Sequence, residues 1–316
     1  MNRWNVKKLI KINNNMRKKR NKIYKYDKTT IDKMYYKVYS CIIKKKASRL
    51  YGWSSRKERI RLMEDRNMER VLCANYGYQL FPFEYFLNSM NKLEVKNIEL
   101  WGAGPHLYQD DCTYEDIRTL RKKITDHHLT VKCYTPEQCM YPINIASSEE
   151  KIRSRSMSYM KKALEIANIM EAPMTLVTVG QGYRNQDKEE AFKRCVDSLL
   201  ELEEKAESCN TTIVLEHLTV TTTNLCVTAK ELARMMKIVK GPSMKAMVDV
   251  DMAARVGEGA KEYLDEMGDA IYHCHFIDGM PGGHLALGDG ILPMDTYLKD
   301  LMDYGYEGYF TMEVLS

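Results

Sequence analysis

Four residues of types that commonly bind metal ions each follow a short apolar run. Glu216 ends TTIVLE, Asp249 ends MKAMVD, His275 lies in YHCHF, and Glu313 ends YFTME. Three carboxylates and one neutral imidazole form a mostly oxygen-donating set of net charge −3, which suits Mn²⁺, Mg²⁺ or Co²⁺ with water or substrate oxygens in the open positions. If buried together, the carboxylates would repel one another unless a cation or protons neutralised them. The alternative is that each is a satisfied polar residue in a hydrogen-bond network.

From residue 71 onward, apolar runs typical of buried strands alternate with amphipathic stretches typical of helices. The predicted strands are 71–76, 95–101, 129–135, 174–180, 211–218, 244–250, 270–276 and 308–314. The predicted helices are 81–93, 114–127 with Thr113 as N-cap, 148–170 opened by Ser148, 187–207, 228–239, 259–268 and 294–304.

Eight buried strands with seven intervening helices indicate an α/β fold with a parallel sheet. Eight such units in about 245 residues favour a closed (β/α)₈ TIM barrel over an open doubly wound sheet. No G-x-G-x-x-G follows the first strand, which disfavours a dinucleotide-binding domain. Because the carboxyl ends of barrel strands converge on one mouth, we expect the four metal-binding candidates, on strands five to eight, to meet there. The predicted barrel lacks a C-terminal eighth helix, so the extension, a partner subunit or nothing covers that gap.

The charge of the chain divides it into a basic extension, 1–70, and a predicted catalytic barrel, 71–316. Residues 1–70 hold 23 Lys and Arg but only 6 Asp and Glu, whereas the rest of the chain is acidic overall. Three interpretations stay open for the extension: a disordered or loosely helical solvated segment, a mis-called start with Met63 or Met68 as the true first residue, or an arm that binds nucleic acid.

Composition excludes several classes of protein. With 44% hydrophobic and 29% charged residues, the chain is neither a disulfide-held mini-protein nor disordered as a whole. There is no apolar run long enough for a membrane span, and the amino terminus lacks the apolar stretch of a signal peptide. The nine cysteines form no C-x-x-C pair. We therefore expect a cytoplasmic protein with reduced thiols and no membrane partner.

An ordered set of short motifs resembles the sugar phosphate isomerase/epimerase superfamily, the xylose isomerase-like TIM barrels. The motifs are I-E-L-W at 98–101, V-L-E-H at 214–217, V-D-V-D-M at 248–252, H-C-H-F-I-D-G at 273–279, L-G-D-G at 287–290 and T-M-E-V at 311–314. The resemblance covers about residues 70–316. It implies that Glu216, Asp249, His275 and Glu313 bind one divalent metal ion, Mn²⁺ before Mg²⁺ or Co²⁺, and that the two glutamates also transfer protons.

Two departures from this resemblance matter. Ketose 3-epimerases have a histidine three residues beyond the aspartate, where this chain has Met252. The arginine that usually follows the metal-binding histidine is absent from 276–290, and His284 is the candidate replacement.

The AP endonucleases of the same superfamily bind three metal ions through many more histidines than the seven of this chain. Nucleic acid is therefore an unlikely partner.

The resemblance and the residues together predict the chemistry. A metal ion chelated by a sugar's carbonyl and hydroxyl oxygens would act as a Lewis acid. Glu216 and Glu313 would remove and return a proton through an enediolate held by the metal. His217 would share that work, or strand alternation would turn it away from the mouth. The candidate substrate-binding residues are Trp101, His106, Glu137, Gln181 and His284. Glu99 alternates with Trp101 and is expected to face the barrel interior.

Three functions stay open. The first is a divalent-metal-dependent sugar isomerase or epimerase. The second is the catalytic subunit of a C-glycoside deglycosidase, a carbon–carbon lyase that acts on 3-oxo-C-glycosides, because the loop 135–147 resembles that branch. The third is a non-catalytic sugar-binding barrel. The expected partners are a small-molecule sugar and either further copies of this chain or a small second subunit.

Overall fold

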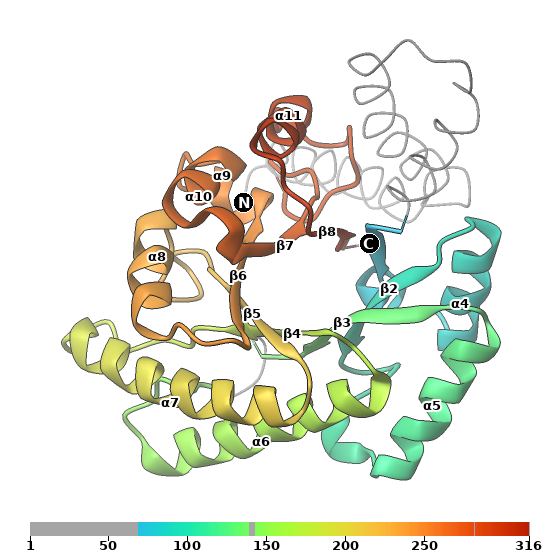
Figure 1. Ribbon diagram of the computed structural model, residues 1–316, viewed down its shortest axis with the longest axis horizontal. Coiled ribbons are helices and arrows are strands. Elements are labelled where there is room, and N and C mark those ends of the chain that lie inside the picture. Colours follow the sequence, from blue (N-terminus) through green and yellow to red (C-terminus); the bar gives the residue numbers. More distant parts are fainter. Residues whose placement is uncertain (1–68, 139–142, 281, 316) are drawn as a thin grey trace, which may run out of the picture.

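The chain folds into a closed barrel of eight parallel strands, in the order β1 to β8 (Figure 1). The computed structural model describes residues 69–138, 143–280 and 282–315. The strands are β1 (Val71–Ala74), β2 (Asn97–Gly102), β3 (Thr130–Pro136), β4 (Met174–Thr178), β5 (Thr212–Glu216), β6 (Met244–Asp249), β7 (Ile271–His275) and β8 (Tyr309–Met312). Parallel pairing of β1 with β8 closes the ring. This confirms the predicted TIM barrel; the predictions for the extension 1–70 lie almost wholly outside the described residues.

Helices surround the barrel, as Figure 1 shows. They are α4 (Phe83–Lys92), α5 (Tyr114–Asp126), α6 (Glu150–Met170), α7 (Lys188–Ser208), α8 (Ala229–Ile238), α9 (Val250–Ala254), α10 (Ala260–Met267) and α11 (Met294–Tyr304), with 3₁₀ turns η1 (Asn75–Tyr78), η2 (Gln109–Asp111) and η3 (Gly268–Ala270). Within the described residues no helix follows β8, and no helix is both long and apolar enough to span a membrane.

Two details of the helices differ from the sequence-based expectation. Helix α6 begins at Glu150 with Glu149 at its N-cap, so Ser148 does not open it. The short helix α9 was not predicted because its sequence, VDMAA, directly continues an apolar strand. Asp249 creates this helix: its side chain accepts a hydrogen bond from the Met252 N–H and caps the first turn. The same residue therefore ends β6 and begins α9.

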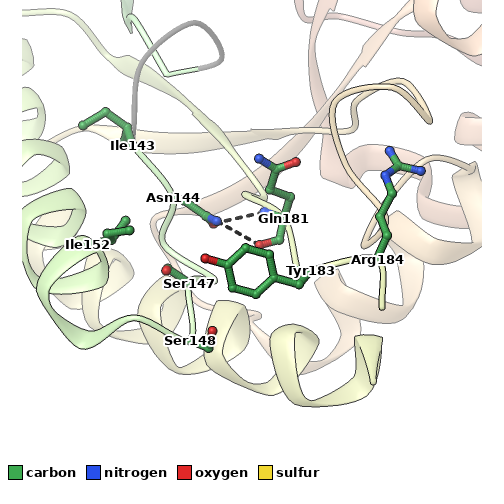
Figure 2. A pocket seen from close by; sticks show the side chains of 9 residues that line it. Ile143, Asn144, Ser147, Ser148, Ile152, Gln181, Tyr183 and Arg184 are labelled. Atoms are coloured by element: carbon green, nitrogen blue, oxygen red, sulfur yellow. Dashed lines mark hydrogen bonds between the residues drawn. The ribbon is translucent and has the colours of Figure 1, made fainter. Parts of the chain in front are cut away.

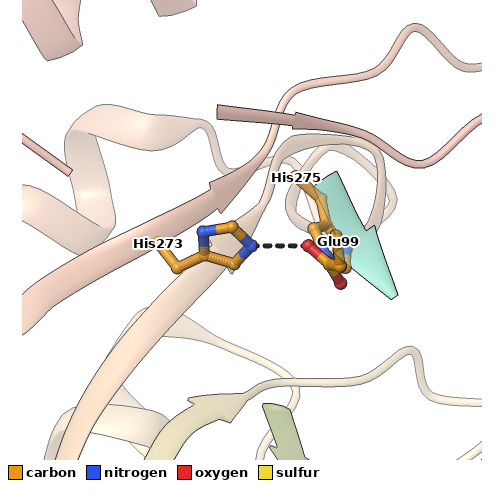
Figure 3. Close-up of side chains that lie close together, drawn as sticks. All are labelled: Glu99, His273 and His275. Carbon is orange, nitrogen blue, oxygen red and sulfur yellow. Dashed lines mark hydrogen bonds and ion pairs between the residues drawn. The ribbon is translucent and has the colours of Figure 1, made fainter. Parts of the chain in front are cut away.

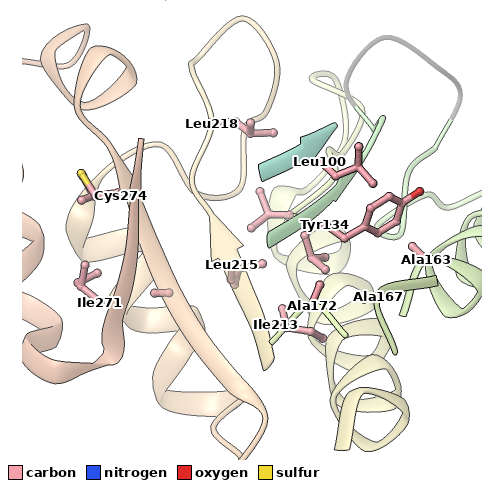
Figure 4. Packing of buried hydrophobic residues seen from close by; sticks show 14 of the residues in the cluster. Leu100, Tyr134, Ala163, Ala167, Ala172, Ile213, Leu215, Leu218, Ile271 and Cys274 are labelled. Atoms are coloured by element: carbon pink, nitrogen blue, oxygen red, sulfur yellow. The ribbon is translucent and has the colours of Figure 1, made fainter. Parts of the chain in front are cut away.

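The strands are buried on both faces, which explains their nearly continuous apolar sequences. On the outer face, side chains such as Leu100, Ile213 and Leu215 belong to the large hydrophobic core that includes helix residues such as Ala163 and Ala167 (Figure 4). Inside the barrel, a small separate cluster comprises Cys133, Met174, Leu176, Val214 and Met247. All seven cysteines in the described part of the chain are unpaired thiols.

Thr113 begins α5 as predicted and forms a capping box with Asp116, because each side chain accepts from the other residue's backbone N–H. We expect Thr113→Ala to lower the free energy of unfolding by about 1 kcal/mol, since two N–H groups lose their fixed acceptors. Thermal unfolding should show a decrease of roughly 2–4 °C. Ser158→Ala removes one exposed hydroxyl that bonds back within α6, and is the matched control. Equal stability of the two variants would contradict the role of the cap.

Candidate metal site

The four predicted ligands converge at the carboxyl ends of β5 to β8. The Nδ1 atom of His275 lies 3.3 Å from Glu216 Oε1, 3.5 Å from Asp249 Oδ2 and 3.2 Å from Glu313 Oε2. Asp249 and His275 are almost completely buried, and the Glu313 side chain retains 12% of its exposure. The strand-end positions therefore do bring these side chains together, with Glu313 nearest to solvent.

These donor atoms fit a metal ion because hydrogen bonds do not account for them. Glu216 Oε1, Asp249 Oδ2 and His275 Nδ1 are buried, and none has a hydrogen-bond partner within the described residues. Buried polar atoms are rarely left in this state, so several such atoms facing one point require an explanation. Ligands about 2.1 Å from an octahedral ion lie about 3 Å apart, which is close to the separations observed here. The set of three carboxylates and one imidazole suits a hard divalent cation.

Without a cation, this site perturbs the protonation of its own groups. Burial first, and then the Glu313 and Asp249 carboxylates, raise the pKa of Glu216 to about 7 against the opposing effect of His275. Burial also disfavours the Asp249 charge, but His275 and His284 outweigh it and lower the pKa to about 2. For Glu313 the same two histidines outweigh burial and lower the pKa. Burial opposes the charge of His275, but the surrounding carboxylates raise its pKa well above the usual value.

A buried carboxylate on β2 supports the opposite side of His275. The Nε2 atoms of His273 and His275 lie 2.8 and 3.1 Å from the two oxygens of Glu99 (Figure 3). The hydroxyls of Thr135 and Thr311 donate to the same carboxylate at 2.6 and 2.7 Å. Burial opposes the charge of Glu99, but His275 and His273 outweigh it and hold its pKa well below the usual range. The sequence predicted that Glu99 faces inward, but the roles of His273 and the two threonines were not predicted.

His217 points away from the carboxylates. Its Nε2 accepts from the Asp249 backbone N–H at 3.2 Å, and its Nδ1 lies 3.0 Å from the Tyr263 hydroxyl. Burial lowers the pKa of His217 to about 4, so the ring is neutral at physiological pH. Both ring nitrogens of His217 are therefore hydrogen-bonded, one to the backbone at the end of β6 and the other to Tyr263. These contacts place His217 against the backbone at the end of β6, and its proton-transfer role stays a prediction.

Aromatic and polar side chains from β2, β3 and the loops lie near the mouth. Trp101 donates from Nε1 to Glu137 Oε2 at 3.1 Å, and the Tyr76 ring meets the Trp101 ring edge-on at 4.7 Å. His284 lies 5.9 Å from the Tyr76 ring, and its Nδ1 donates to the Glu313 carbonyl at 3.0 Å. Burial opposes the His284 charge, but Glu313 and Asp249 raise its pKa to about 10. Tyr76 thus contacts both Trp101 and His284, and His284 connects this group to the four-residue cluster through Glu313.

The other two predicted substrate-binding residues, His106 and Gln181, are hydrogen-bonded to neighbouring loop segments. His106 is held by an earlier segment of the chain, with Nε2 2.8 Å from the Phe81 carbonyl and Nδ1 3.0 Å from the Asn75 amide. Gln181 is exposed and lines a separate pocket of about 340 Å³ between the loops that follow β3 and β4. In Figure 2, the Asn144 side chain joins the two loops, because its amide N–H donates to the Gln181 carbonyl and its Oδ1 accepts from the Gln181 N–H. None of the four metal-binding candidates lines this pocket.

Comparisons with known proteins agree with this architecture. Residues 67–316 match the model of the xylose isomerase-like TIM barrel family. A fructoselysine 3-epimerase of Escherichia coli O157:H7 is 29% identical over 242 residues, or 76% of this chain and 88% of that protein. A D-psicose 3-epimerase structure from Clostridium cellulolyticum H10 has a TM-score of 0.65 at 19% identity, covering 77% of this chain and 83% of that one. A 3-keto-D-glucoside 4-epimerase structure from E. coli has a TM-score of 0.64 at 17% identity, covering 77% and 90%. At such identities the two structures show the shared fold.

Proposed function

Because the chain belongs to the xylose isomerase-like TIM barrel family, we propose that it is a divalent-metal-dependent sugar epimerase or isomerase. The observation that carries the proposal is that Glu216 Oε1 and Asp249 Oδ2 lie 3.3 and 3.5 Å from His275 Nδ1. These three buried atoms have no hydrogen-bond partner among the described residues. Similarity to the fructoselysine 3-epimerase supports chemistry at a carbon beside a ketone. We favour epimerisation of a keto-sugar over isomerisation for this reason.

Four side chains of this protein would hold the ion: Glu216, Asp249, His275 and Glu313. When bound, the ion would supply a Lewis acid for the carbonyl and hydroxyl oxygens of the sugar. Mn²⁺ is our first choice, because the ligand set is mostly carboxylate with one imidazole.

Glu216 and Glu313 are the proposed proton-transfer groups. They come from β5 and from the end of β8, three strands apart in the ring, so they approach the site from different sides. One carboxylate would remove the proton from the carbon beside the carbonyl, and the other would return a proton to the opposite face.

The remaining residues near the mouth have supporting roles in this proposal. Trp101 would offer an apolar ring face to the sugar, and Glu137, bonded to the indole, would fix that ring. His284 would hold the Glu313 carboxylate and offer its free side to a substrate oxygen. His106 and Gln181 are not proposed as sugar ligands, given their contacts described above.

Proton exchange in heavy water tests the proposed function. The purified full chain with Mn²⁺ would be incubated in D₂O with a panel of keto-sugars, including fructoselysine and unmodified ketoses, and with 3-oxo-glycosides. The proposal predicts one deuterium at the carbon beside the ketone together with a new epimer. Release of an aglycone from a 3-oxo-C-glycoside would instead support the lyase, and sugar binding without exchange would support the non-catalytic barrel. Residues 139–142, in the loop that suggested the lyase, lie outside the described part of the chain.

A further inference from the structure

Glu99 is the most completely hydrogen-bonded carboxylate inside the barrel. Its side chain is 1% exposed and accepts from residues on three different strands, β3, β7 and β8. Oε1 faces Thr135 and His275, and Oε2 faces Thr311 and His273. An ionised carboxylate has only acceptor sites, so each of these four neighbours must present an N–H or O–H to it.

This requirement determines which nitrogen of His275 is available to a metal ion. To bind a metal ion the His275 imidazole must be neutral, with one N–H, and Glu99 Oε1 requires that this N–H sit on Nε2, 3.1 Å away. The lone pair must then lie on Nδ1, the atom that faces the Glu216, Asp249 and Glu313 oxygens. The bond to Glu99 also fixes the rotation of the ring about its Cβ–Cγ bond.

We propose that Glu99 is a positioning residue that sets the tautomer and orientation of His275 for metal binding. The inference rests on the proposed function, because Glu99 would position a ligand of the same proposed metal ion. His273 belongs to the same hydrogen-bonded group, but its Nδ1 has no partner within the described residues and does not face the three carboxylates. His273 therefore completes the hydrogen bonding of Glu99 without touching the ion.

The test compares Mn²⁺ affinity in Glu99→Leu, His273→Leu and wild-type protein by electron paramagnetic resonance of free Mn²⁺. Glu99→Leu removes the acceptor at similar volume and should weaken the affinity by roughly 10–100-fold. His273→Leu is the matched control, since it removes another partner of Glu99 but leaves the Glu99–His275 bond, and its affinity should stay within about threefold of wild type. Equal affinities in Glu99→Leu and wild type would overturn the proposal.

A spectroscopic measurement separates positioning from a general loss of structure. In Co²⁺-loaded wild-type protein, an imidazole bound through Nδ1 leaves Nε2–H as a hyperfine-shifted, exchangeable proton in the NMR spectrum. We expect this proton to be protected from exchange in wild type and in His273→Leu, and to broaden or disappear in Glu99→Leu. If Glu99→Leu does not fold, absence of the protected proton in wild type alone overturns the inference, as does a second bound ion per chain at Glu99. Failure of wild type to bind Mn²⁺ or Co²⁺ at all would instead reject the proposed function.

Discussion

Glu313→Gln should lower the kcat for epimerisation by about 10²–10⁴-fold, the usual contribution of a positioned general acid or base. Glutamine keeps the shape of the side chain and an oxygen that still faces His275, but it cannot take up or release the proton. Because an anionic ligand is also lost, Mn²⁺ affinity should fall too, and the expected pattern is that epimerisation at saturating Mn²⁺ stays reduced by this factor. Steady-state rates and Mn²⁺ titration on the same preparation would measure both quantities.

Glu313→Gln also tests whether the reaction uses two proton-transfer groups or one. If Glu216 serves one face of the sugar and Glu313 the other, Glu313→Gln should still exchange deuterium into one epimer without converting it to the other. Glu307→Gln is the matched control, because Glu307 is exposed and precedes β8, at the opposite end of the strand from Glu313. Epimerisation by Glu313→Gln within threefold of the Glu307→Gln rate would exclude Glu313 as a proton-transfer group.

The barrel and the convergence of its four polar strand ends could be predicted because both follow from local pattern. Buried parallel strands are continuous apolar runs, and the first polar residue after such a run lies at the mouth. Glu216 and Asp249 end β5 and β6 in this way, and His275 ends β7. The predicted strand boundaries missed by up to two residues at several ends, where the chain leaves the sheet but stays apolar.

The contacts of the histidines could not be predicted because they depend on side chains far apart in the sequence. His273 and Glu99 meet across the barrel although 174 positions separate them. His217 follows Glu216 directly, but strand alternation turns it outward to Tyr263 on α10. His106 lies in a glycine-bearing loop, and the Phe81 carbonyl that occupies its Nε2 comes from a different loop. Sequence pattern predicts which face a side chain takes, but not which distant atom satisfies it.

Removal of the metal ion should make stability fall as the pH rises through 7. Glu216 has a folded pKa of about 7 against an ordinary value of 4.5. A carboxyl whose pKa is raised on folding stabilises the folded state fully when the pH is below its ordinary pKa. This stabilisation is lost as the pH rises through the folded-state pKa. The raised pKa values of His275 and His284 act in the same direction, and the lowered pKa values of His217 and His273 act in the opposite direction. The pKa of Asp249 is about 2, outside this interval. The midpoint of thermal unfolding of the chelator-treated protein should therefore be lower at about pH 8 than at about pH 6.

Mn²⁺ should reverse the loss of stability at high pH, because its positive charge neutralises the buried carboxylates in place of the protons that they release. At one hundred times its dissociation constant, the ion would stabilise the fold by about 2.7 kcal/mol, a rise of roughly 5–10 °C in the unfolding midpoint. The rise should be larger at about pH 8, where protons no longer compete for Glu216. Differential scanning calorimetry with and without Mn²⁺ at the two pH values measures it. Equal midpoints under all four conditions would contradict a metal site in this cluster.

Glu216→Gln tests separately how the buried Glu216 charge affects stability and how it contributes to metal binding. The amide is neutral at every pH, so the midpoint of the metal-free variant should fall less than that of wild type between about pH 6 and pH 8, and the variant should unfold above wild type at the higher pH. The same variant should gain less from Mn²⁺, since an anionic ligand is gone. Stabilisation without metal and loss of response to metal are expected together, because a protein tolerates buried like charges only where they serve a function. A variant that is less stable than wild type at pH 8 and still responds fully to Mn²⁺ would show that Glu216 serves the fold rather than the ion.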